Sequence, residues 1–203
     1  MGRIYNLEGN YIYEGGLLNY KKNGKGTEKT NDFTYKGNFF DNNKSGFGFI
    51  TFLKSGDFFE GDFKDNRIFK GLYSWKESKN TYEGFFENNK MHGEGVYTYS
   101  SGSKSTYIGN YKNGKKHGFG IIKENNNIIY EGEFFEGNPH GQGFRFDKNG
   151  NKIKIEMDKG KRISIKNNES SGKRLSKTIG LSNLMKLNFL LFDLIFFYFF
   201  YFI

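Results

Sequence analysis

Three histidines, His92, His117 and His140, are the side chains of this sequence best suited to metal binding or acid–base chemistry. Each directly precedes a Gly-x-Gly sequence, so the three occupy one position of a repeated pattern. If each repeat contributes two β-strands, the histidines lie about 10 Å apart along the sheet, too far to share one metal ion. We therefore expect each histidine to close a turn onto the neighbouring repeat rather than to form a metal site.

The glycine pairs, the carboxylates and the cysteine content give no sign of a nucleotide-binding, catalytic or thiolate site. The glycine pairs are followed by short strand patterns rather than by the helix that a nucleotide-binding loop needs. Carboxylates such as Glu83, Glu87, Glu131 and Glu133 alternate with aromatic residues, which predicts a solvated polar face. The chain has no cysteine, which excludes disulfides and thiolate chemistry. We expect no catalytic or metal-binding residue, no cofactor and no small-molecule substrate.

The spacing of glycine and aromatic residues identifies the elements that hold these groups. Tyr82 to Tyr99 reads YEGFFENNKMHGEGVYTY, two alternating segments around an Asn-Asn-Lys turn, which is typical of a β-hairpin. The same stretch recurs along the chain, with an aromatic residue two positions before a glycine. These pairs are Tyr13/Gly15, Tyr35/Gly37, Phe59/Gly61, Tyr82/Gly84, Tyr107/Gly109 and Tyr130/Gly132, and successive glycines lie 22, 24, 23, 25 and 23 residues apart.

A second glycine pair follows the first glycine at distances of nine and eleven residues in five of the six units. These pairs are Gly24/Gly26, Gly46/Gly48, Gly93/Gly95, Gly118/Gly120 and Gly141/Gly143. The third unit has only Gly71 at this place. An isolated hairpin is marginally stable in water, so we expect each unit to be stabilised by stacking against the next.

The sequence therefore predicts an all-β protein, an elongated single twisted antiparallel sheet of consecutive β-hairpin repeats, on the order of 55–60 Å long. The leading aromatic residue and the one four positions later share one face, and the glycine between them leaves room for a ring over the backbone. We place an N-terminal cap or half-unit at residues 1–10 and the array at 11–160. Its units are 13–34, 35–58, 59–81, 82–106, 107–129 and 130–152, with a further half-unit reaching to 160.

The segment from Tyr107, YIGNYKNGKKHGFG, follows the pattern Y-x-G-x-[FWY]-x-x-[NG]-x-x-x-G-x-G. At a period near 23 this array resembles the MORN (membrane occupation and recognition nexus) repeat family, across roughly residues 11–150. The resemblance implies that two sets of residues matter. The repeat-defining positions are Tyr35, Gly37, Gly46, Gly48, Tyr82, Gly84, Gly93, Gly95, Tyr107, Gly109, Gly118, Gly120, Tyr130, Gly132, Gly141 and Gly143. The candidate aromatic lining of a partner-binding groove is Phe39, Phe63, Phe86, Tyr97, Tyr99, Tyr111 and Phe134.

Charge is concentrated in the C-terminal part of the chain. Residues 1–158 hold 23 Lys/Arg and 20 Asp/Glu (+3), whereas residues 159–203 hold 8 and 2 (+6). The repeats are too weakly basic for nucleic-acid binding driven by counterion release. Residues 161–188 read as a basic flexible linker, in which Lys173, Arg174, Lys177 and Lys186 are candidate contacts for an anionic membrane.

The last fifteen residues, 189–203, are FLLFDLIFFYFFYFI. As a helix they would be about 22 Å long, shorter than the ~30 Å hydrocarbon core of a bilayer. We interpret this segment as a short hydrophobic helix that is a candidate tail anchor or interfacial segment. The alternative is a stretch of biased composition without function.

We expect an intracellular protein, cytoplasmic or cytoskeletal, with the tail as a candidate membrane anchor. The leading hypothesis is a non-enzymatic scaffold that presents an aromatic groove to a partner protein or to a second copy of itself. By resemblance, such proteins occur in cytoskeletal, ciliary and membrane-junction assemblies. One alternative is a phospholipid-binding (phosphoinositide-binding) tethering module. A second is the accessory repeat region of a lipid kinase or methyltransferase that lacks its catalytic domain.

Overall fold

The computed structural model describes residues 1–9, 11–102 and 104–165. These residues form fifteen β-strands and no helix. The strands are β1 (Gly2–Tyr5), β2 (Tyr11–Leu18), β3 (Lys21–Lys29), β4 (Phe33–Phe40), β5 (Asn43–Phe52), β6 (Phe58–Lys64), β7 (Arg67–Ser74), β8 (Thr81–Glu87), β9 (Lys90–Tyr99), β10 (Ser105–Lys112), β11 (Lys115–Glu124), β12 (Asn127–Phe135), β13 (Asn138–Phe146), β14 (Lys152–Asp158) and β15 (Lys161–Ile165).

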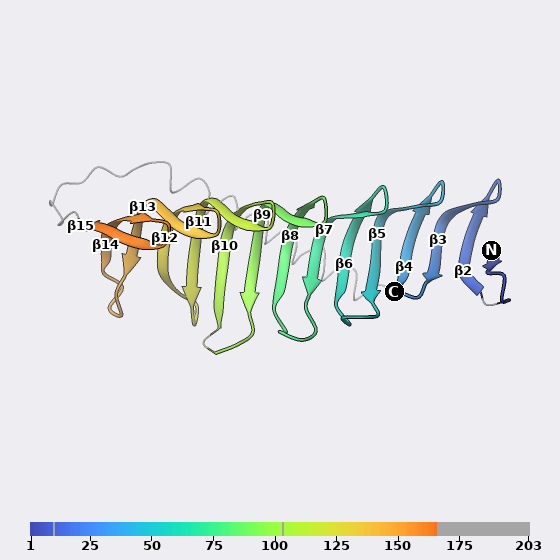
Figure 1. The fold of residues 1–203 in the computed structure, drawn as a ribbon, viewed down its shortest axis with the longest axis horizontal. Coiled ribbons are helices and arrows are strands. Elements are labelled where there is room, and N and C mark those ends of the chain that lie inside the picture. Colours follow the sequence, from blue (N-terminus) through green and yellow to red (C-terminus); the bar gives the residue numbers. More distant parts are fainter. Residues whose placement is uncertain (10, 103, 166–203) are drawn as a thin grey trace, which may run out of the picture. The chain divides into compact units, whose positions relative to one another are not determined.

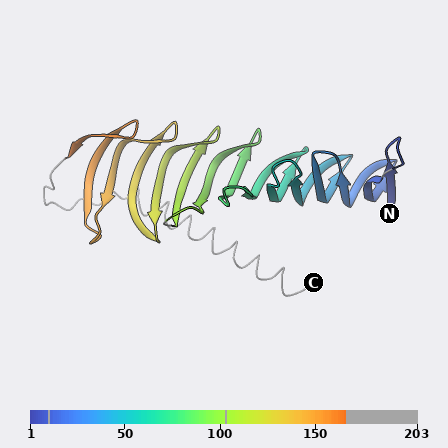
Figure 2. The same ribbon diagram turned by 60° about the horizontal axis from the view of Figure 1, so that its bottom comes forward.

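All fifteen strands belong to one open antiparallel sheet, in which their order in space is their order in the chain (Figure 1 and Figure 2). The turns within the repeat units lie along one long side of this sheet, and the connections between units lie along the other (Figure 1). The predicted all-β fold of consecutive hairpins is therefore confirmed. The hydrophobic helix predicted for residues 189–203 lies outside the described residues.

A row of paired glycines crosses the sheet and fixes its register. Gly15 pairs with Gly26, Gly26 with Gly37, and Gly37 with Gly48. The row continues without interruption through Gly61, Gly71, Gly84, Gly95, Gly109, Gly120, Gly132 and Gly143. The period read from the sequence thus corresponds to one line of backbone contacts across twelve strands.

An aromatic ring lies over each glycine pair within a hairpin, Phe59 in the third unit and a tyrosine in the other five, and this explains why no side chain is tolerated there. A Cβ atom added to Gly84 or Gly95 would lie 2.5 or 2.4 Å from the hydroxyl oxygen of Tyr82, which is two residues before Gly84 on the same strand. Each tyrosine hydroxyl donates a hydrogen bond to the carbonyl oxygen three residues later. These bonds are Tyr13 to Gly16 (2.7 Å), Tyr35 to Asn38 (2.9 Å), Tyr82 to Phe85 (3.0 Å), Tyr107 to Asn110 (3.1 Å) and Tyr130 to Glu133 (3.1 Å).

The first glycine of each second pair has a different role, because it occupies a β-bulge. Gly24, Gly46, Gly93, Gly118 and Gly141 have φ between +64° and +82°, a region that favours glycine. The register of the hairpin shifts at this place in every one of these units, as between Gly37 and Phe39 of β4. The tyrosine hydroxyl bonds to a carbonyl at this irregularity.

The third unit belongs to the sheet although its sequence departs from the pattern. Its second strand is one residue shorter between the turn and Gly71, so the position of the bulge glycine is missing. Asp62 consequently stays in register with Lys70, and the leading ring is Phe59, which has no hydroxyl to donate. The shorter bulge, the lost glycine and the lost hydroxyl form one coupled change.

The core of the sheet is a continuous series of rings in edge-to-face contact. From Tyr35 to Tyr107, each leading ring contacts the second ring of its own unit and that of the next unit. Among the described rings, Tyr13 contacts only Phe39, and Tyr130 contacts only Phe134. Tyr82, for example, lies 5.1 Å from Phe86 and 5.1 Å from Tyr111, between ring centroids. The series comprises Tyr13, Phe39, Tyr35, Phe63, Phe59, Phe86, Tyr82, Tyr111, Tyr107, Phe134 and Tyr130, all 0–7% exposed. Edge-to-face geometry adds to the burial of the rings and locks neighbouring units together.

Backbone bonds between turns reinforce this stacking. Asn42 and Asn66 lie in their turns with φ of +70° and +66°, and each donates its N–H to a carbonyl just past the turn of the preceding unit. The acceptors are Lys22 and Lys44, at 3.0 and 3.1 Å.

The two ends of the sheet differ. At the N-terminal end β1 pairs with β2, Gly2 opposite Gly15. At the other end Ile155 of β14 takes the place of a glycine opposite Gly143 and is buried, so the row of glycines ends there. Lys161–Ile165 is strand β15, which corrects the prediction that the flexible linker begins at residue 161.

Candidate functional site

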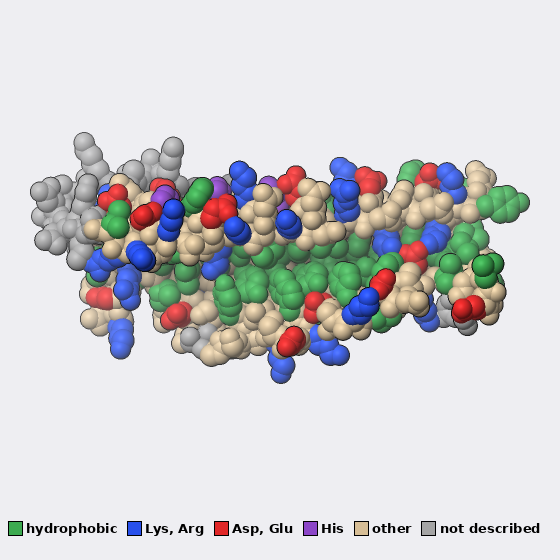
Figure 3. Space-filling model, in the orientation of Figure 1, with side chains coloured by type: hydrophobic (Ala, Val, Ile, Leu, Met, Phe, Trp, Pro, Cys, Tyr) green, Lys and Arg blue, Asp and Glu red, His purple; other side chains and the backbone are tan. Residues whose placement is uncertain are grey.

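Five half-buried aromatic residues form a continuous strip on the face that carries the core rings. We call this strip the aromatic band; it consists of Phe52 of β5, Tyr73 of β7, Trp75 just after β7, and Tyr97 and Tyr99 of β9. Figure 3 shows hydrophobic side chains gathered along the middle of this face, between two rims that are mostly polar.

The rings of the aromatic band touch one another across the strands. Phe52 stacks on Tyr73 at 6.0 Å, Tyr73 lies 4.7 Å from Trp75, and Trp75 lies 5.4 Å from Tyr97. Tyr97 in turn lies 4.6 Å from Tyr99.

Two polar groups fix hydroxyls of the band. Asp57 Oδ2 accepts a hydrogen bond from the Tyr73 hydroxyl at 3.2 Å, and Asn80 Nδ2 donates to the Tyr97 hydroxyl at 3.0 Å. Burial, together with the charge of Asp57, raises the pKa of Tyr73 to about 12, so its hydroxyl stays protonated at neutral pH. The band is therefore a neutral, oriented aromatic surface.

The structure separates the aromatic residues predicted to line a groove into two groups. Phe39, Phe63, Phe86, Tyr111 and Phe134 are the second rings of the core series and are 3–7% exposed, so they offer a partner almost no area. Tyr97 and Tyr99 are half-buried members of the aromatic band. The lining of the face therefore comes mainly from the second strands of the hairpins, because the first strands fill the core.

The repeat-defining residues of the prediction fall into the two structural positions described above. The tyrosines and the glycines of the row form the backbone contacts across the sheet, and the other glycines form the bulges. None of them presents a functional group toward the aromatic band.

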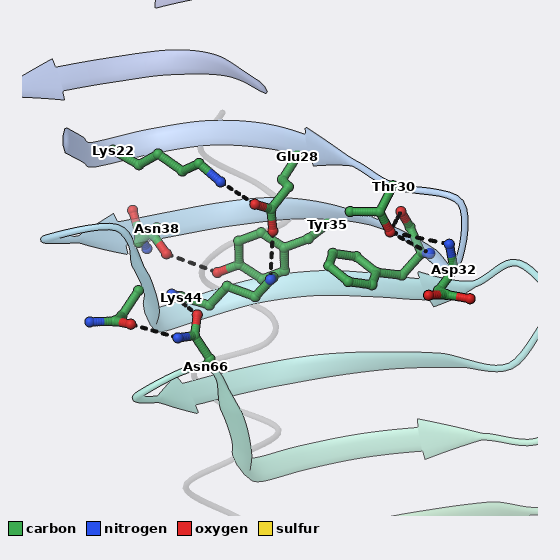
Figure 4. Close-up of polar contacts among 10 residues, drawn as sticks. Lys22, Glu28, Thr30, Asp32, Tyr35, Asn38, Lys44 and Asn66 are labelled. Carbon is green, nitrogen blue, oxygen red and sulfur yellow. Dashed lines mark hydrogen bonds and ion pairs between the residues drawn. The ribbon is translucent and has the colours of Figure 1, made fainter. Parts of the chain in front are cut away.

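A cluster of charged side chains bounds the band toward the N-terminus. In this lysine–glutamate cluster, Lys22 of β3 and Lys44 of β5 both pair with Glu28 of β3 (Figure 4). Lys44 Nζ lies 2.6 Å from Glu28 Oε2, and the three side chains are only 10–16% exposed. Lys44 Nζ also lies 4.3 Å from the centre of the Phe33 ring and 5.4 Å from that of Tyr35. Figure 3 shows basic and acidic side chains at one end of the hydrophobic strip.

The cluster keeps Glu28 ionised. Burial alone would raise the pKa of the Glu28 carboxyl, but the hydrogen bonds and positive charges of Lys22 and Lys44 outweigh burial and lower it. At neutral pH the cluster consequently holds two ammonium groups and one carboxylate.

A single lysine lies at the other end of the band. Lys116 Nζ of β11 lies 4.8 Å from the centre of the Tyr107 ring and 5.5 Å from that of Tyr99. Lys22, Lys44 and Lys116 occupy the same repeat position, two residues before the bulge glycine. Both ends of the band are thus cationic.

The histidines do not form a common site. His92 Nδ1 lies 3.1 Å from a carboxylate oxygen of Glu87, and His140 Nδ1 lies 3.4 Å from one of Asp158. His117 instead contacts the ring of Phe135 at 5.5 Å. Within the described residues, no group of three or more His, Cys, Asp or Glu side chains is arranged to hold a metal ion.

One carboxylate departs from the predicted solvated face. Glu131 is 7% exposed and pairs with Lys152 at 2.5 Å, while Lys152 Nζ lies 3.9 Å from the centre of the Phe144 ring. The sequence pattern did not show that Lys152 of β14, two strands along the sheet from β12, pairs with Glu131 across β13.

The predicted membrane contacts Lys173, Arg174, Lys177 and Lys186 lie outside the described residues. In the part of the chain that the structure describes, no helix is long and apolar enough to cross a membrane.

Sequence reasoning missed Tyr73, Trp75 and the lysine–glutamate cluster. Tyr73 and Trp75 follow the irregular second strand of the third unit, where the glycine spacing gives no register. The lysines had a signal, since they recur two residues before the bulge glycine in three units. Glu28 had none, because its place beside Lys44 depends on the pairing of β3 with β4 and of β4 with β5.

These features define a repeat protein built from β-hairpins that share one sheet and one aromatic face. The MORN repeat matches residues 13–33, 35–52, 82–104, 107–123 and 130–152, and the chain belongs to the MORN repeat family. The match leaves out residues 53–81, which the structure nevertheless places in the sheet as β6 and β7. MORN repeats are generally non-catalytic modules. No curated protein matches the sequence.

Proposed function

We propose that this chain is a non-catalytic scaffold that binds a segment of another protein along the aromatic band. The observation that carries the proposal is the band itself, five half-buried rings in mutual contact on an otherwise closed aromatic core. Tryptophan and tyrosine are the residues most often found at energetic hot spots of protein interfaces.

The sheet supports this role because it holds the rings in place before binding. Phe52 is fixed against Tyr73, and the Tyr73 and Tyr97 hydroxyls are bonded to Asp57 and Asn80. A partner therefore loses little affinity to the ordering of these side chains. The same long face suits a scaffold, which needs contact area rather than a reacting group.

A random peptide library displayed on phage tests this proposal, with the full-length chain as target. We expect selected peptides to bind the Trp75→Ala or Tyr97→Ala variant at least about tenfold more weakly than the wild type, as hot-spot truncations do. The matched control is Phe49→Ala, because Phe49 lies on the opposite face of β5 and is exposed. Peptides that bind all three variants as well as the wild type would refute the proposal.

Membrane association is a separate proposal that rests on the sequence of the C-terminal segment. Co-sedimentation of the full-length chain with phosphatidylserine vesicles tests it. Replacing Lys173, Arg174, Lys177 and Lys186 by alanine is expected to weaken binding by about 1 kcal/mol per residue near an anionic surface. Vesicle binding that is unchanged in this variant would assign the contact to another part of the chain.

A further inference from the structure

The lysine–glutamate cluster has two lysines but only one glutamate, so it carries a net positive charge. Lys22 and Lys44 share the single carboxylate of Glu28, which leaves one positive charge at a place where all three side chains are 10–16% exposed. An ammonium group has three N–H donors. Within the described residues, the hydrogen bonds and ion pairs of each ammonium group engage one carboxylate oxygen of Glu28. The cluster can therefore accept a second carboxylate.

Because the two lysine ammonium groups are largely buried, binding of a second carboxylate is favourable. Two ammonium groups withdrawn from water repel each other, and one carboxylate and the rings of Phe33 and Tyr35 offset this only in part. A further anion would pair with groups that are already desolvated and held in position, so little ordering cost remains to be met on binding.

Lys116 offers a second cationic contact at the far end of the band. Among the described residues no carboxylate pairs with it; its ammonium group faces the rings of Tyr99, Tyr107 and Phe134. Asp57, the carboxylate that contacts the band, is already engaged by the Tyr73 hydroxyl and by the backbone N–H of Lys76 at 3.0 Å. These neutral donors do not cancel the charge of Asp57, but three lysines (Lys22, Lys44 and Lys116) against two carboxylates (Glu28 and Asp57) leave a net charge of +1 along the band.

We propose that the partner of the aromatic band is an acidic peptide segment. Its carboxylates bind the Lys22–Lys44 pair at one end and Lys116 at the other, and its apolar side chains cover the rings between them. The inference rests on the proposed function and names the chemistry of its partner. A lipid head group would match one cationic end but would leave the aromatic band uncovered.

The sheet geometry sets the spacing of the acidic residues. Lys44 and Lys116 occupy equivalent positions on β5 and β11, six strands apart, which corresponds to roughly 29 Å. An extended segment covers this distance with about nine residues, and a helix with about nineteen.

The experiment uses a random library of 20-residue peptides displayed on phage and selected on the full-length chain. Peptides that depend on Trp75 are synthesised with their acidic residues intact and with each Asp or Glu replaced by its amide. Calorimetry measures their affinity for the wild type, Lys44→Met, Lys116→Met and the control Lys36→Met. Methionine keeps an unbranched apolar side chain at each position. Lys36 is an exposed lysine of β4 on the opposite face from Tyr35.

We expect the Trp75-dependent peptides to be enriched in Asp and Glu. Replacing the acidic residues by amides should weaken binding about tenfold or more, as expected for charge-assisted hydrogen bonds. Lys44→Met should weaken the acidic peptide similarly and the amide peptide hardly at all, because the two changes remove the same interaction. Lys36→Met should change neither affinity. Lys116→Met gives an independent reading if Lys44→Met does not fold.

Two results would overturn the inference. If Trp75-dependent peptides carry no acidic enrichment, or bind equally well as amides, the aromatic band binds peptides but the charge assignment is wrong. If Lys44 is instead required for binding phosphatidylserine vesicles while no acidic peptide binds, the cluster takes phosphate groups. By contrast, the absence of any Trp75-dependent peptide contradicts the proposed function itself.

Discussion

The hydroxyl of each leading tyrosine offers a direct test of how the repeats are held together. Tyr107 is fully buried, and its hydroxyl donates to the carbonyl of Asn110 at 3.1 Å. Phe59 occupies the equivalent place in the third unit, where Asp62 is in regular register with Lys70. The exchange Tyr107→Phe removes a hydroxyl that has an acceptor. The reverse exchange Phe59→Tyr adds a hydroxyl to the third unit. The β-bulge of this unit is one residue shorter than in the other units, so we expect no backbone carbonyl to be turned toward the added hydroxyl.

Both exchanges are expected to destabilise the sheet, for different reasons. Tyr107→Phe loses one buried hydrogen bond and leaves the Asn110 carbonyl without this donor, at a cost of about 1–2 kcal/mol. Phe59→Tyr buries a hydroxyl without a partner, at a cost of about 1–3 kcal/mol. An argument based on family resemblance alone predicts the opposite sign for Phe59→Tyr, since tyrosine is the residue found in the other five units.

Urea unfolding of the full-length chain, followed by far-ultraviolet circular dichroism, measures both effects. The slope of the free energy of unfolding against urea has to match that of the wild type, because repeat arrays can lose cooperativity. A Tyr107→Phe variant as stable as the wild type would show that the hydroxyl bond contributes nothing. A Phe59→Tyr variant more stable than the wild type would show that the third unit has a free acceptor after all.

Three further predictions concern the glycines, the tyrosines and the C-terminal end of the sheet. Gly120→Ala places a Cβ 2.4 Å from the Tyr107 hydroxyl oxygen and should lower the free energy of unfolding by about 1–3 kcal/mol or more through overpacking. The loss should be larger than that of Gly118→Ala, where the only strain is a φ of +65°; the urea midpoints of the two variants test this. Burial raises the pKa of Tyr35 and of Tyr130 to about 12, so the contribution of these two tyrosines to stability should be constant from neutral pH to about pH 10. It should then fall by roughly 1.4 kcal/mol per pH unit per tyrosine between about pH 10 and 12; urea midpoints against pH, with tyrosinate absorbance, check this. Ile155→Ala removes the buried side chain that ends the row of glycines and should cost about 2–5 kcal/mol in thermal or urea unfolding, whereas Ile163→Ala, at an exposed residue of β15, should change little.

The fold could be predicted from the sequence because the positions of the glycines determine the register of strand pairing. A glycine two positions after an aromatic ring, followed at fixed distances by a second pair, sets both the length of each hairpin and the face of each side chain. Positions such as Tyr82 and Gly95 are constrained by backbone contacts that any member of the array must make. The strand pairing of each unit can therefore be predicted from its own residues and those of the next unit.

The candidate site could be predicted only in part, because it is built from contacts between units. Of the residues predicted to line a groove, Tyr97 and Tyr99 are half-buried members of the aromatic band, whereas Phe39 and Phe63 lie in the core. The sequence shows which face a ring lies on, but not whether the next unit covers it. The approach of Lys44 to Glu28 likewise depends on two successive strand pairings.

The third unit shows why the departure from the repeat pattern is informative about function. Its shortened bulge and its Phe59 would be unexplained losses if every unit served only to extend the sheet. The same unit supplies Tyr73 and Trp75, which join Phe52 of the second unit to Tyr97 of the fourth. At the place of Tyr73 on the second strand, the second and fifth units carry Ile50 and Ile122, and the fourth unit carries Tyr97. The irregular third unit therefore contributes two of the five rings of the aromatic band and connects the rings of its two regular neighbours, which gives the surface that we propose for binding its continuity across three units.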